Sequence, residues 1–456
     1  MVVPDCLRRD VSALVARRSR SAINPGPAIA GGWPDDDHLD TGHQPVLRRD
    51  DVLRLGNVAC ARTDHRHTGR RCAMRVLIWT KAFAPSTGGI ERYSATLARG
   101  LSEQGLDVIV ATETGAPDGF DASVHYRVCR RPSHSDLARL MDQADVVHLC
   151  GPAVGPMRLA LRSNAALAIE HSGYQLVCPS GMLLRYPDES ICPNHFRARQ
   201  HSRCVRCLVT QGAAGPLRAA ARVAAGQLRT RLAADVRVAH IAVSQHVARR
   251  LGLPDVVVIP HGIDPPEPID RWLPEQFAYV GRLVREKGVD ILLDAFSTVA
   301  RERPDAQLRI VGDGPLRDAL ETNATALGVG TNVTFLGGVA FDQIDAALAD
   351  VATVVVPSRC EETFGLVALE QAARGRQVIT SDIGGLGEVA RAINARLVPP
   401  GDRNALADNM LRGIEHAERT NPAPTLPESL TAERMVDRHI ELYEHLLKKD
   451  RPRGRG

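Results

Sequence analysis

Lysine is almost absent from this sequence, since only four of its 57 basic residues are lysines: Lys81, Lys287, Lys448 and Lys449. Arginine supplies the cation nearly everywhere else. An internal lysine is therefore conspicuous, because it offers a compact point charge where arginine offers a planar fork.

The sequence also lacks long apolar runs and a strong charge excess. No apolar run approaches the roughly 20 residues that a helix needs to span a bilayer. The start of the chain has no basic-then-apolar secretory pattern, so we expect a cytoplasmic protein. The formal net charge is only +4, which argues against a nucleic-acid partner. With 456 residues and 44% hydrophobic content, two domains of ordinary size are expected.

Residues 1–73 differ from the rest of the chain. They contain no Lys and no Glu, and they mix Arg, Asp, His, Pro and Gly without sustained periodicity. We interpret them as a disordered extension or a mis-called translation start ahead of Met74. The alternative is a small regulatory appendage.

From Met74 onward, strand patterns alternate with helical patterns in two series separated by a proline-rich link at 253–274. This alternation predicts an α/β protein with parallel sheets and helices on both faces. We expect two doubly wound, Rossmann-like domains facing each other across a cleft, at 74–255 and 256–430, and a final helix at 431–449 that packs back on the first domain. The expected strands are 75–80, 106–111, 145–149, 166–171 and 240–243, then 277–280, 307–311, 333–336, 353–356 and 377–380.

Two glutamates lie eight positions apart around a Phe-Gly turn. The apolar run 353–356 predicts a buried strand, so Glu362 lies in the loop after it and Glu370 about two turns along the next helix. Such loops lie at the carboxyl ends of parallel strands, where open α/β sheets bind ligands. Helix-start N–H groups suit a diphosphate and carboxylates suit sugar hydroxyls. Taken alone, a capped helix with a surface Glu pair would explain the motif as well.

A second loop, Gly281 to Gly288, follows the first expected strand of the second series. Arg282 and Lys287 in this loop could both reach a diphosphate, although a solvated loop carries similar charges. The turn from Val311 to Pro315 is not the G-x-G-x-x-G of a dinucleotide site, which argues against a nicotinamide dehydrogenase.

Six segments in order make a pattern that is highly specific. The chain resembles a retaining glycosyltransferase of the GT-B fold, from the family-four group that includes bacterial mannosyl- and glucosyltransferases. The matching segments are 88–92, 258–264, 281–290, 311–315, 362–370 and 397–402. The family often has Asn at the position of His261 and Pro at that of Gly387, and His148 stands where His-x-His is commoner.

The resemblance implies roles for individual residues. Arg282 and Lys287 would hold the donor diphosphate and stabilise the leaving group. Glu370 would bind the ribose hydroxyls, and Glu362, selected over Glu361 by spacing, would hold the transferred sugar.

The backbone N–H groups of Phe364 and Gly365 would assist Glu362. Gly88 and Gly89 would let the first-domain backbone approach the phosphates. His171, at the end of its expected strand, would lie near the donor sugar and the acceptor; the alternative is a satisfied core histidine.

The reaction implied is transfer of a sugar from a nucleotide-sugar donor to a hydroxyl of a glycan, glycolipid or small-molecule acceptor, with retention of configuration. No metal cofactor is expected for catalysis, because positive side chains replace the cation and no Asp-x-Asp motif follows a strand in the cleft region. The alternatives are a catalytically silent nucleotide-sugar sensor and another GT-B enzyme, such as a sugar-nucleotide epimerase or a phosphorylase.

Four cysteines lie within thirty residues as Cys178-x13-Cys192-x11-Cys204-x2-Cys207. The C-x2-C spacing lets two thiolates bind one tetrahedral ion, and a loop-rich segment needs a cross-link. We expect a structural zinc site here. An iron–sulfur cluster and free thiols are the alternatives, and His195 or His201 could replace one cysteine.

The segment Gly215 to Val236 is rich in Ala, Leu and Arg and has helical periodicity. Arg218, Arg222 and Arg229 fall on one helical face, which could rest on anionic lipid at the inner face of a membrane. An ordinary solvated helix is the alternative.

Overall fold

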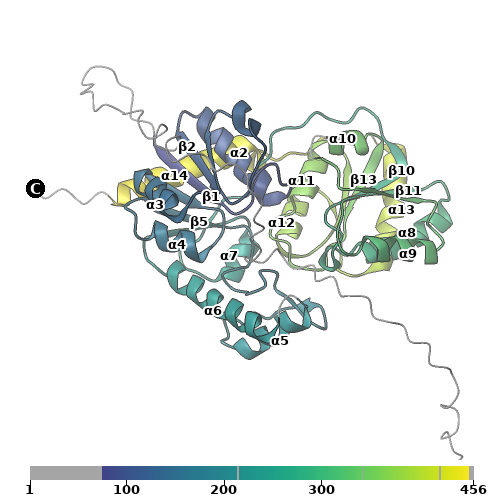
Figure 1. Ribbon diagram of the computed structural model, residues 1–456. Coiled ribbons are helices and arrows are strands. Elements are labelled where there is room, and N and C mark those ends of the chain that lie inside the picture. Colours follow the sequence, from purple (N-terminus) through teal and green to yellow (C-terminus); the bar gives the residue numbers. More distant parts are fainter. Residues whose placement is uncertain (1–73, 213–214, 341–342, 421–422, 451–456) are drawn as a thin grey trace, which may run out of the picture.

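The structure is a computed structural model that describes residues 74–212, 215–340, 343–420 and 423–450. The interpretation of residues 1–73 lies outside the described residues. The remainder forms two α/β halves that lie side by side (Figure 1).

The first half is built on a seven-stranded parallel sheet in the order β3-β2-β1-β4-β5-β8-β9. Its strands are β1 (Arg75–Thr80), β2 (Asp107–Thr112), β3 (Arg127–Arg130), β4 (Val146–Leu149), β5 (Ala166–His171), β8 (Val238–Ala242) and β9 (Val257–Val258). Its helices are α2 (Gly89–Glu103), α3 (His134–Gln143), α4 (Val154–Ala160), α5 (His201–Thr210), α6 (Pro216–Ala233) and α7 (Gln245–Leu251).

The second half has a six-stranded parallel sheet in the order β12-β11-β10-β13-β14-β15. Its strands are β10 (Leu273–Val280), β11 (Gln307–Val311), β12 (Val333–Gly337), β13 (Val351–Val356), β14 (Gln377–Ser381) and β15 (Arg396–Val398). Its helices are α8 (Val289–Glu302), α9 (Arg317–Ala326), α10 (Ile344–Ala347), α11 (Leu366–Ala373), α12 (Gly384–Ala392) and α13 (Arg403–Arg419).

The central strands are apolar along their whole length because helices cover both faces of each sheet. All six residues of β13 and all six of β5 are buried. The predicted strands therefore exist in the predicted order, and the doubly wound α/β fold class is confirmed. Sequence periodicity missed the short edge strands β3, β9 and β15.

The strand order fixes where a ligand can bind. In the second sheet, β10 lies between β11 and β13, so the connections leave β10 and β13 in opposite directions and open a crevice at their carboxyl ends. The loop with Arg282 and Lys287 follows β10, and the loop with Glu362 follows β13. The topology thus brings the two predicted motifs to one place.

The last helix, α14 (Ala432–Asp450), returns to the first half and packs beside α2 (Figure 1). Gly100 on α2 makes room for it, because a Cβ there would lie 2.4 Å from Cγ2 of Val436. Met435, Val436 and Tyr443 share one apolar cluster with residues of β1 and α2.

The cysteine-rich segment is an insertion between β5 and β8. It contains a small hairpin, β6 (Leu184–Arg185) with β7 (Ser190–Ile191), followed by α5 and α6. We predicted a loop-rich segment, but Cys204 and Cys207 lie on α5. Among the described residues, no helix combines the length and apolarity needed to cross a bilayer.

Candidate functional site

Lys287 and Glu362 form a direct ion pair, with 2.7 Å between Nζ and Oε1. The Ser358 hydroxyl donates a second hydrogen bond to the same carboxylate oxygen. Burial alone would lower the pKa of Lys287, but the carboxylate of Glu362 raises it overall. Burial alone would raise the pKa of Glu362, but Lys287 and then Ser358 lower it. Both groups therefore stay charged at neutral pH.

The loops that carry this pair are in backbone contact. Gly288 has a φ of 68°, and a Cβ there would lie 2.2 Å from the carbonyl oxygen of Pro357. The Arg359 N–H donates to the carbonyl of Glu286 at 2.9 Å. A glycine is required at 288 because the two loops approach so closely.

Arg282 lies beside Lys287. The Tyr279 hydroxyl donates to the Arg282 carbonyl at 2.8 Å. The Arg282 side chain is 63% exposed and lies 4.0 Å from Glu286. Its positive charge is close enough to oppose the protonation of Lys287. Two adjacent cations are suited to a multiply charged anion.

Glu370 is buried on α11 and forms an ion pair with Arg92 of α2 in the other half. Burial raises the pKa of Glu370 even though Arg92 and Arg374 oppose the shift. We did not predict Arg92 as a site residue, although it belongs to the quoted segment 88–92. Its guanidinium contacts the carboxylate that the family resemblance assigns to a ribose.

The glycine pair lies at the start of α2, where Gly88 is the N-cap and Gly89 the first helical residue, and Gly89 faces the start of α11. A Cβ on Gly89 would lie 3.5 Å from Cδ1 of Leu366, the first residue of α11. Gly365, with a φ of 103°, caps α11, and the ring of Phe364 is buried. The first-half backbone therefore does approach the loop between β13 and α11.

Glu361 and Glu362 point to different partners. Glu361 pairs with Arg250 of α7 at 2.7 Å and lies 3.4 Å from His246. This contact ties the β13–α11 loop to the first half, whereas Glu362 faces Lys287. The two adjacent carboxylates thus have different partners, and the choice of Glu362 over Glu361 as the sugar-binding residue stays a prediction.

His171 is fully buried at the end of β5. Its Nε2 lies 3.1 Å from Nδ1 of His240, and Nε2 of His240 lies 2.9 Å from the Ala233 carbonyl. Burial and then His240 lower the pKa of His171 to about 3, so its ring is neutral. The neighbouring Ser172 carbonyl accepts a hydrogen bond from Thr363 at 3.0 Å. The ring itself contacts none of the charged loop residues, and its role stays a prediction.

A buried polar network, which sequence reasoning missed, lies behind this loop. Its carboxylate is Glu170, the one charged residue in the apolar strand β5. Nε2 of His261 lies 3.1 Å from its Oε1, and Nε2 of His148 lies 3.7 Å from its Oε2. Burial alone would raise the pKa of Glu170, but the two adjacent histidines hold it low. A lone acid in a buried strand was the available sequence signal.

Tyr93 joins this network to α14. Its hydroxyl lies 3.0 Å from Nε2 of His439 and 3.4 Å from Nε2 of His148, and its ring stacks on His261 with centroids 4.4 Å apart. His261 in turn packs against Phe364 at 5.2 Å. The network therefore connects the last helix to the loop that carries Glu362.

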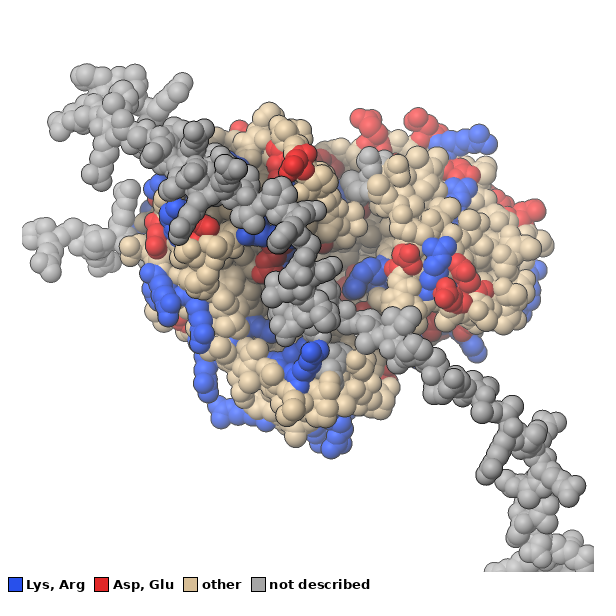
Figure 2. Space-filling view, in the orientation of Figure 1, with Lys and Arg blue, Asp and Glu red and all other residues tan. Residues whose placement is uncertain are grey.

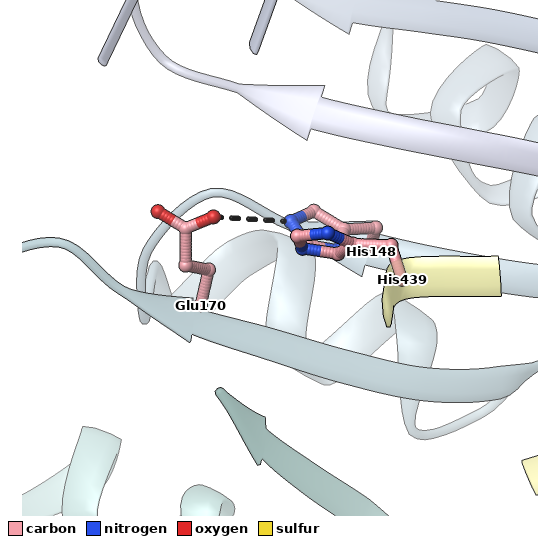
Figure 3. Close-up of side chains that lie close together, drawn as sticks. All are labelled: His148, Glu170 and His439. Carbon is pink, nitrogen blue, oxygen red and sulfur yellow. Dashed lines mark ion pairs between the residues drawn. The ribbon is translucent and has the colours of Figure 1, made fainter. Parts of the chain in front are cut away.

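Within the described part of the chain, His148, Glu170 and His439 are the one trio whose ligand atoms all lie within 4.8 Å of one another (Figure 3). Their nitrogens already have partners: the Tyr443 hydroxyl lies 2.9 Å from Nδ1 of His148, and Nδ1 of His439 donates to the Met435 carbonyl at 2.8 Å. A hydrogen-bonded network explains this trio without a metal ion.

Two cavities border the charged loops. One of about 410 Å³ lies between the halves and is lined by Phe364, Ser244 and Glu388 among others. The other, of about 570 Å³, is lined by Glu189, Arg359 and Arg403. Neither is lined by Lys287, Glu362 or Glu370.

Two family descriptions match the chain in order. "Glycosyltransferase Family 4" matches residues 87–267, and "Glycosyl transferases group 1" matches residues 274–416. The boundary between them coincides with the proline-rich link.

Several curated relatives are similar to part of the chain. An uncharacterized glycosyltransferase, MJ1607, of Methanocaldococcus jannaschii is 39% identical over 130 residues, covering 28% of this chain and 33% of the relative. A glycogen synthase of Mycobacterium tuberculosis is 38% identical over 146 residues, covering 30% and 34%. These matches span about a third of each relative's length.

Solved structures share the fold over most of the chain. A glycosyltransferase from Rickettsia africae has a TM-score of 0.59 and 19% identity, covering 83% of this chain and all (100%) of that one. Anabaena Alr3699/HepE, solved with UDP and glucose, has a TM-score of 0.61 and 18% identity, covering 81% and 99%. The architecture is thus that of the GT-B glycosyltransferases, and with both halves matched in order the chain belongs to the family 4, or group 1, glycosyltransferases.

Proposed function

We propose that this protein is a hexosyltransferase that moves a sugar from a nucleotide-sugar donor to an acceptor hydroxyl. The observation that carries the proposal is the contact between Lys287 and Glu362 at the carboxyl ends of β10 and β13, with Arg282 exposed beside them. A family 4 chain that had lost its activity would have no need to keep this arrangement of charges.

The charges suggest how a donor would bind. A diphosphate placed at the β10–α8 loop would draw Lys287 and Arg282 to its oxygens, because it carries more negative charge than one carboxylate. Glu362 would then turn its oxygens to the hydroxyls of the sugar, while Ser358 keeps one hydrogen bond to it. The cations would stabilise the departing nucleoside diphosphate without a metal ion.

Glu370 would bind the ribose after Arg92 moves aside or shares the carboxylate. The N–H groups of Phe364 and Gly365 would hold the sugar from the start of α11, and Gly88 and Gly89 would cover the phosphates from the other half. Among the described residues, Nδ1 of the buried His171 ring has no hydrogen-bond partner, and it would accept from a hydroxyl near the transferred sugar once the site opens to the ligand.

Relatives support the donor class. HepE was solved with UDP-glucose, and a Mycobacterium tuberculosis relative is named a GDP-mannose-dependent mannosyltransferase that acts on a phosphatidylinositol dimannoside. We propose a nucleotide-sugar donor, retention of configuration, and a glycan, glycolipid or small-molecule acceptor.

The test has two steps. A thermal-shift screen of UDP-, GDP- and ADP-sugars should identify one stabilising donor, and release of nucleoside diphosphate from that donor should then follow with or without acceptor. A silent sensor would bind without releasing the diphosphate, and an epimerase would return an altered sugar nucleotide. Either result would overturn the proposal.

We further propose that the insertion places this enzyme at the inner face of an anionic membrane. Residues 190–234 contain eight arginines and neither Asp nor Glu, and basic side chains lie along the edge formed by α6 and α5 (Figure 2). Leu217 at the start of α6 is 89% exposed. Arg229 does not belong to the predicted basic face of α6, because its guanidinium donates inward to the Gln175 carbonyl at 2.8 Å. Arg218 and Arg222 make up the rest of the predicted face.

Vesicle sedimentation tests the membrane proposal. The wild type should bind vesicles that contain phosphatidylglycerol, but not vesicles of phosphatidylcholine alone, and salt should weaken the binding. Arg218→Glu with Arg222→Glu should abolish it, whereas Arg412→Glu with Arg419→Glu on α13 makes the same charge change elsewhere. Equal loss in both double variants would point to net charge rather than to this face.

A further inference from the structure

The four cysteines of the insertion come from three separate places in its chain. Cys178 lies in the turn after β5, Cys192 directly follows β7, and Cys204 and Cys207 lie one turn apart on α5. None of them forms a disulfide. The fold must therefore bring these thiols together if they act as one group.

Two of these cysteines, Cys192 and Cys207, contact the β6–β7 hairpin. Sγ of Cys207 lies 3.8 Å from the Leu184 carbonyl and accepts the Tyr186 N–H at 3.4 Å. The Cys192 N–H donates to the Leu183 carbonyl at 2.7 Å. The same two residues, 183 and 184, are thus flanked by Cys192 on one side and by Cys207 on the other. An N–H group aimed at sulfur is the outer contact that thiolate ligands of metals use.

Cys178 joins the same group through a tight turn. The Gly181 N–H donates to its carbonyl at 3.0 Å, which leads the chain from Cys178 directly into β6. Cys204 is buried in the apolar cluster of the insertion, one helical turn before Cys207 on α5.

The histidines of the segment separate into two cases. Nδ1 of His195 lies 3.8 Å from Sγ of Cys192, so His195 borders the group. His201 turns away, with Nδ1 3.2 Å from Nε2 of Gln227 on α6. Four cysteines are enough to fill the four positions of a tetrahedral metal site, so His195 would lie beside the ligands without being one of them.

We propose that Cys178, Cys192, Cys204 and Cys207 bind one structural Zn²⁺ ion. Zinc prefers four tetrahedral thiolates in closed structural sites, at a Zn–S distance of about 2.3 Å. Within the described residues, no three of the four sulfurs lie within 4.8 Å of one another. The ion would draw them inward and release the thiol protons. With all four positions filled by protein, the site has no open place for a substrate.

The insertion has a physical need for such a cross-link. Its own apolar cluster consists of five buried residues, namely Phe196, Cys204, Leu208, Ala219 and Val223, and its two strands have two residues each. Leu183 beside the hairpin packs instead into the core of the first half. A metal ion shared by Cys192 and the two cysteines of α5 would join these two parts of the insertion.

The zinc site would also hold a bridge between the two halves. Glu189, between β6 and β7, pairs with Arg359 at 3.2 Å and with Arg285. Arg285 belongs to the same short helical turn as Lys287. This part of the inference rests on the proposed function: an ordered hairpin would keep the β10–α8 loop placed for the donor.

Metal analysis of the full chain tests the site. Protein purified without a histidine tag should carry about one zinc per chain, measured by mass spectrometry of the elements. Cys204→Ser with Cys207→Ser should lower this at least about tenfold. Cys129→Ser, a half-buried cysteine on β3 outside the insertion, should keep it, as should Glu362→Gln, which would abolish transfer but not metal binding.

A second measurement covers the case in which the double variant fails to fold. An organomercurial titration of the wild type should release zinc as four thiols react, and cobalt-substituted protein should show the absorption of a tetrahedral thiolate site. A wild type without stoichiometric metal, one that carries iron, or equal zinc loss in Cys129→Ser would overturn the proposal.

Discussion

Two buried carboxylates, Glu362 and Glu170, are held ionised in different ways. Glu362 is paired with a lysine whose own pKa is raised by the contact. Glu170 is hydrogen-bonded to His261 and lies 3.7 Å from His148, in a network that extends to His439. Both carboxylates have lowered pKa values, and the partner of Glu362 is a lysine that stays positive throughout the neutral range.

The difference indicates a separate role for each of the two regions. A lysine that can leave a carboxylate for a diphosphate gives an exchangeable charge next to the crevice. The carboxylate of Glu170 lies among histidines in the interior and is 1% exposed, so no ligand can reach it to replace a histidine. We therefore assign chemistry to the first region and placement of the Phe364 loop, through His261, to the second.

The largest expected effect is at Lys287. Lys287→Ala should lower transfer by about 100- to 1,000-fold, the range seen when one preorganised electrostatic group is lost. It should also destabilise the fold by more than the roughly 1 kcal/mol of an exposed pair, because Glu362 loses its partner in a part-buried site. Steady-state kinetics and urea unfolding measure the two effects. Lys448→Ala on α14 is the control, and full activity in Lys287→Ala would contradict the assigned role.

The pH dependence of stability separates the two regions next. Burial, followed by a neighbouring histidine, lowers the pKa of both His439 and His171 to about 3. The unfolded chain binds protons more readily at these sites, so stability falls as the pH drops below about 6.5. Each histidine should cost about 2 kcal/mol between pH 7 and pH 5.

The charged pair behaves differently over the same interval. The pKa of Lys287 is raised, so its contribution to stability is lost only when the pH rises through that raised pKa. The pKa of Glu362 is lowered, so its contribution to stability is lost only when the pH falls below about 4.3. Urea unfolding of His439→Gln should show a flatter pH dependence than the wild type from pH 7 to 5. In Lys287→Ala with Glu362→Gln the slope should be unchanged; a flattened slope there would reverse the comparison.

Glu361, in the loop before α11, and Glu370, on α11, allow a further comparison between two carboxylates of one segment. Glu370→Gln should raise the donor KM about tenfold, the loss of one hydrogen bond to a charged group, with a small change in kcat. Glu361→Gln should leave KM near the wild-type value, since Glu361 faces Arg250 and His246. Initial-rate kinetics over a range of donor concentrations would decide, and equal KM values would remove the ribose role from Glu370.

Sequence reasoning found what local patterns determine. The buried strands, their alternation with helices and the loops after β10 and β13 all follow from periodicity and turn residues, so Lys287 and Glu362 could be placed in one crevice. Arg92 could not be paired with Glu370, because that contact joins helices of different halves. Tyr93, His439 and Tyr443 were missed for the same reason, because Tyr93 and its partner His439 on α14 are 346 positions apart in the sequence.

The smallest effect is expected at the bridge that Glu189 makes from the insertion to the second half. Glu189→Gln removes the charge that faces Arg285 and Arg359, and because these pairs are partly exposed the loss should be about 1 kcal/mol or less. The donor KM should rise no more than about fivefold, while zinc content and the pH dependence of stability stay at wild-type values.

Arg285 lies two residues from Lys287, so a larger fall in kcat than in affinity would mean that the hairpin supports the lysine during the chemical step. In that case the insertion belongs with the charged pair rather than with the buried network, since only the charged pair lies on the loop that Glu189 reaches.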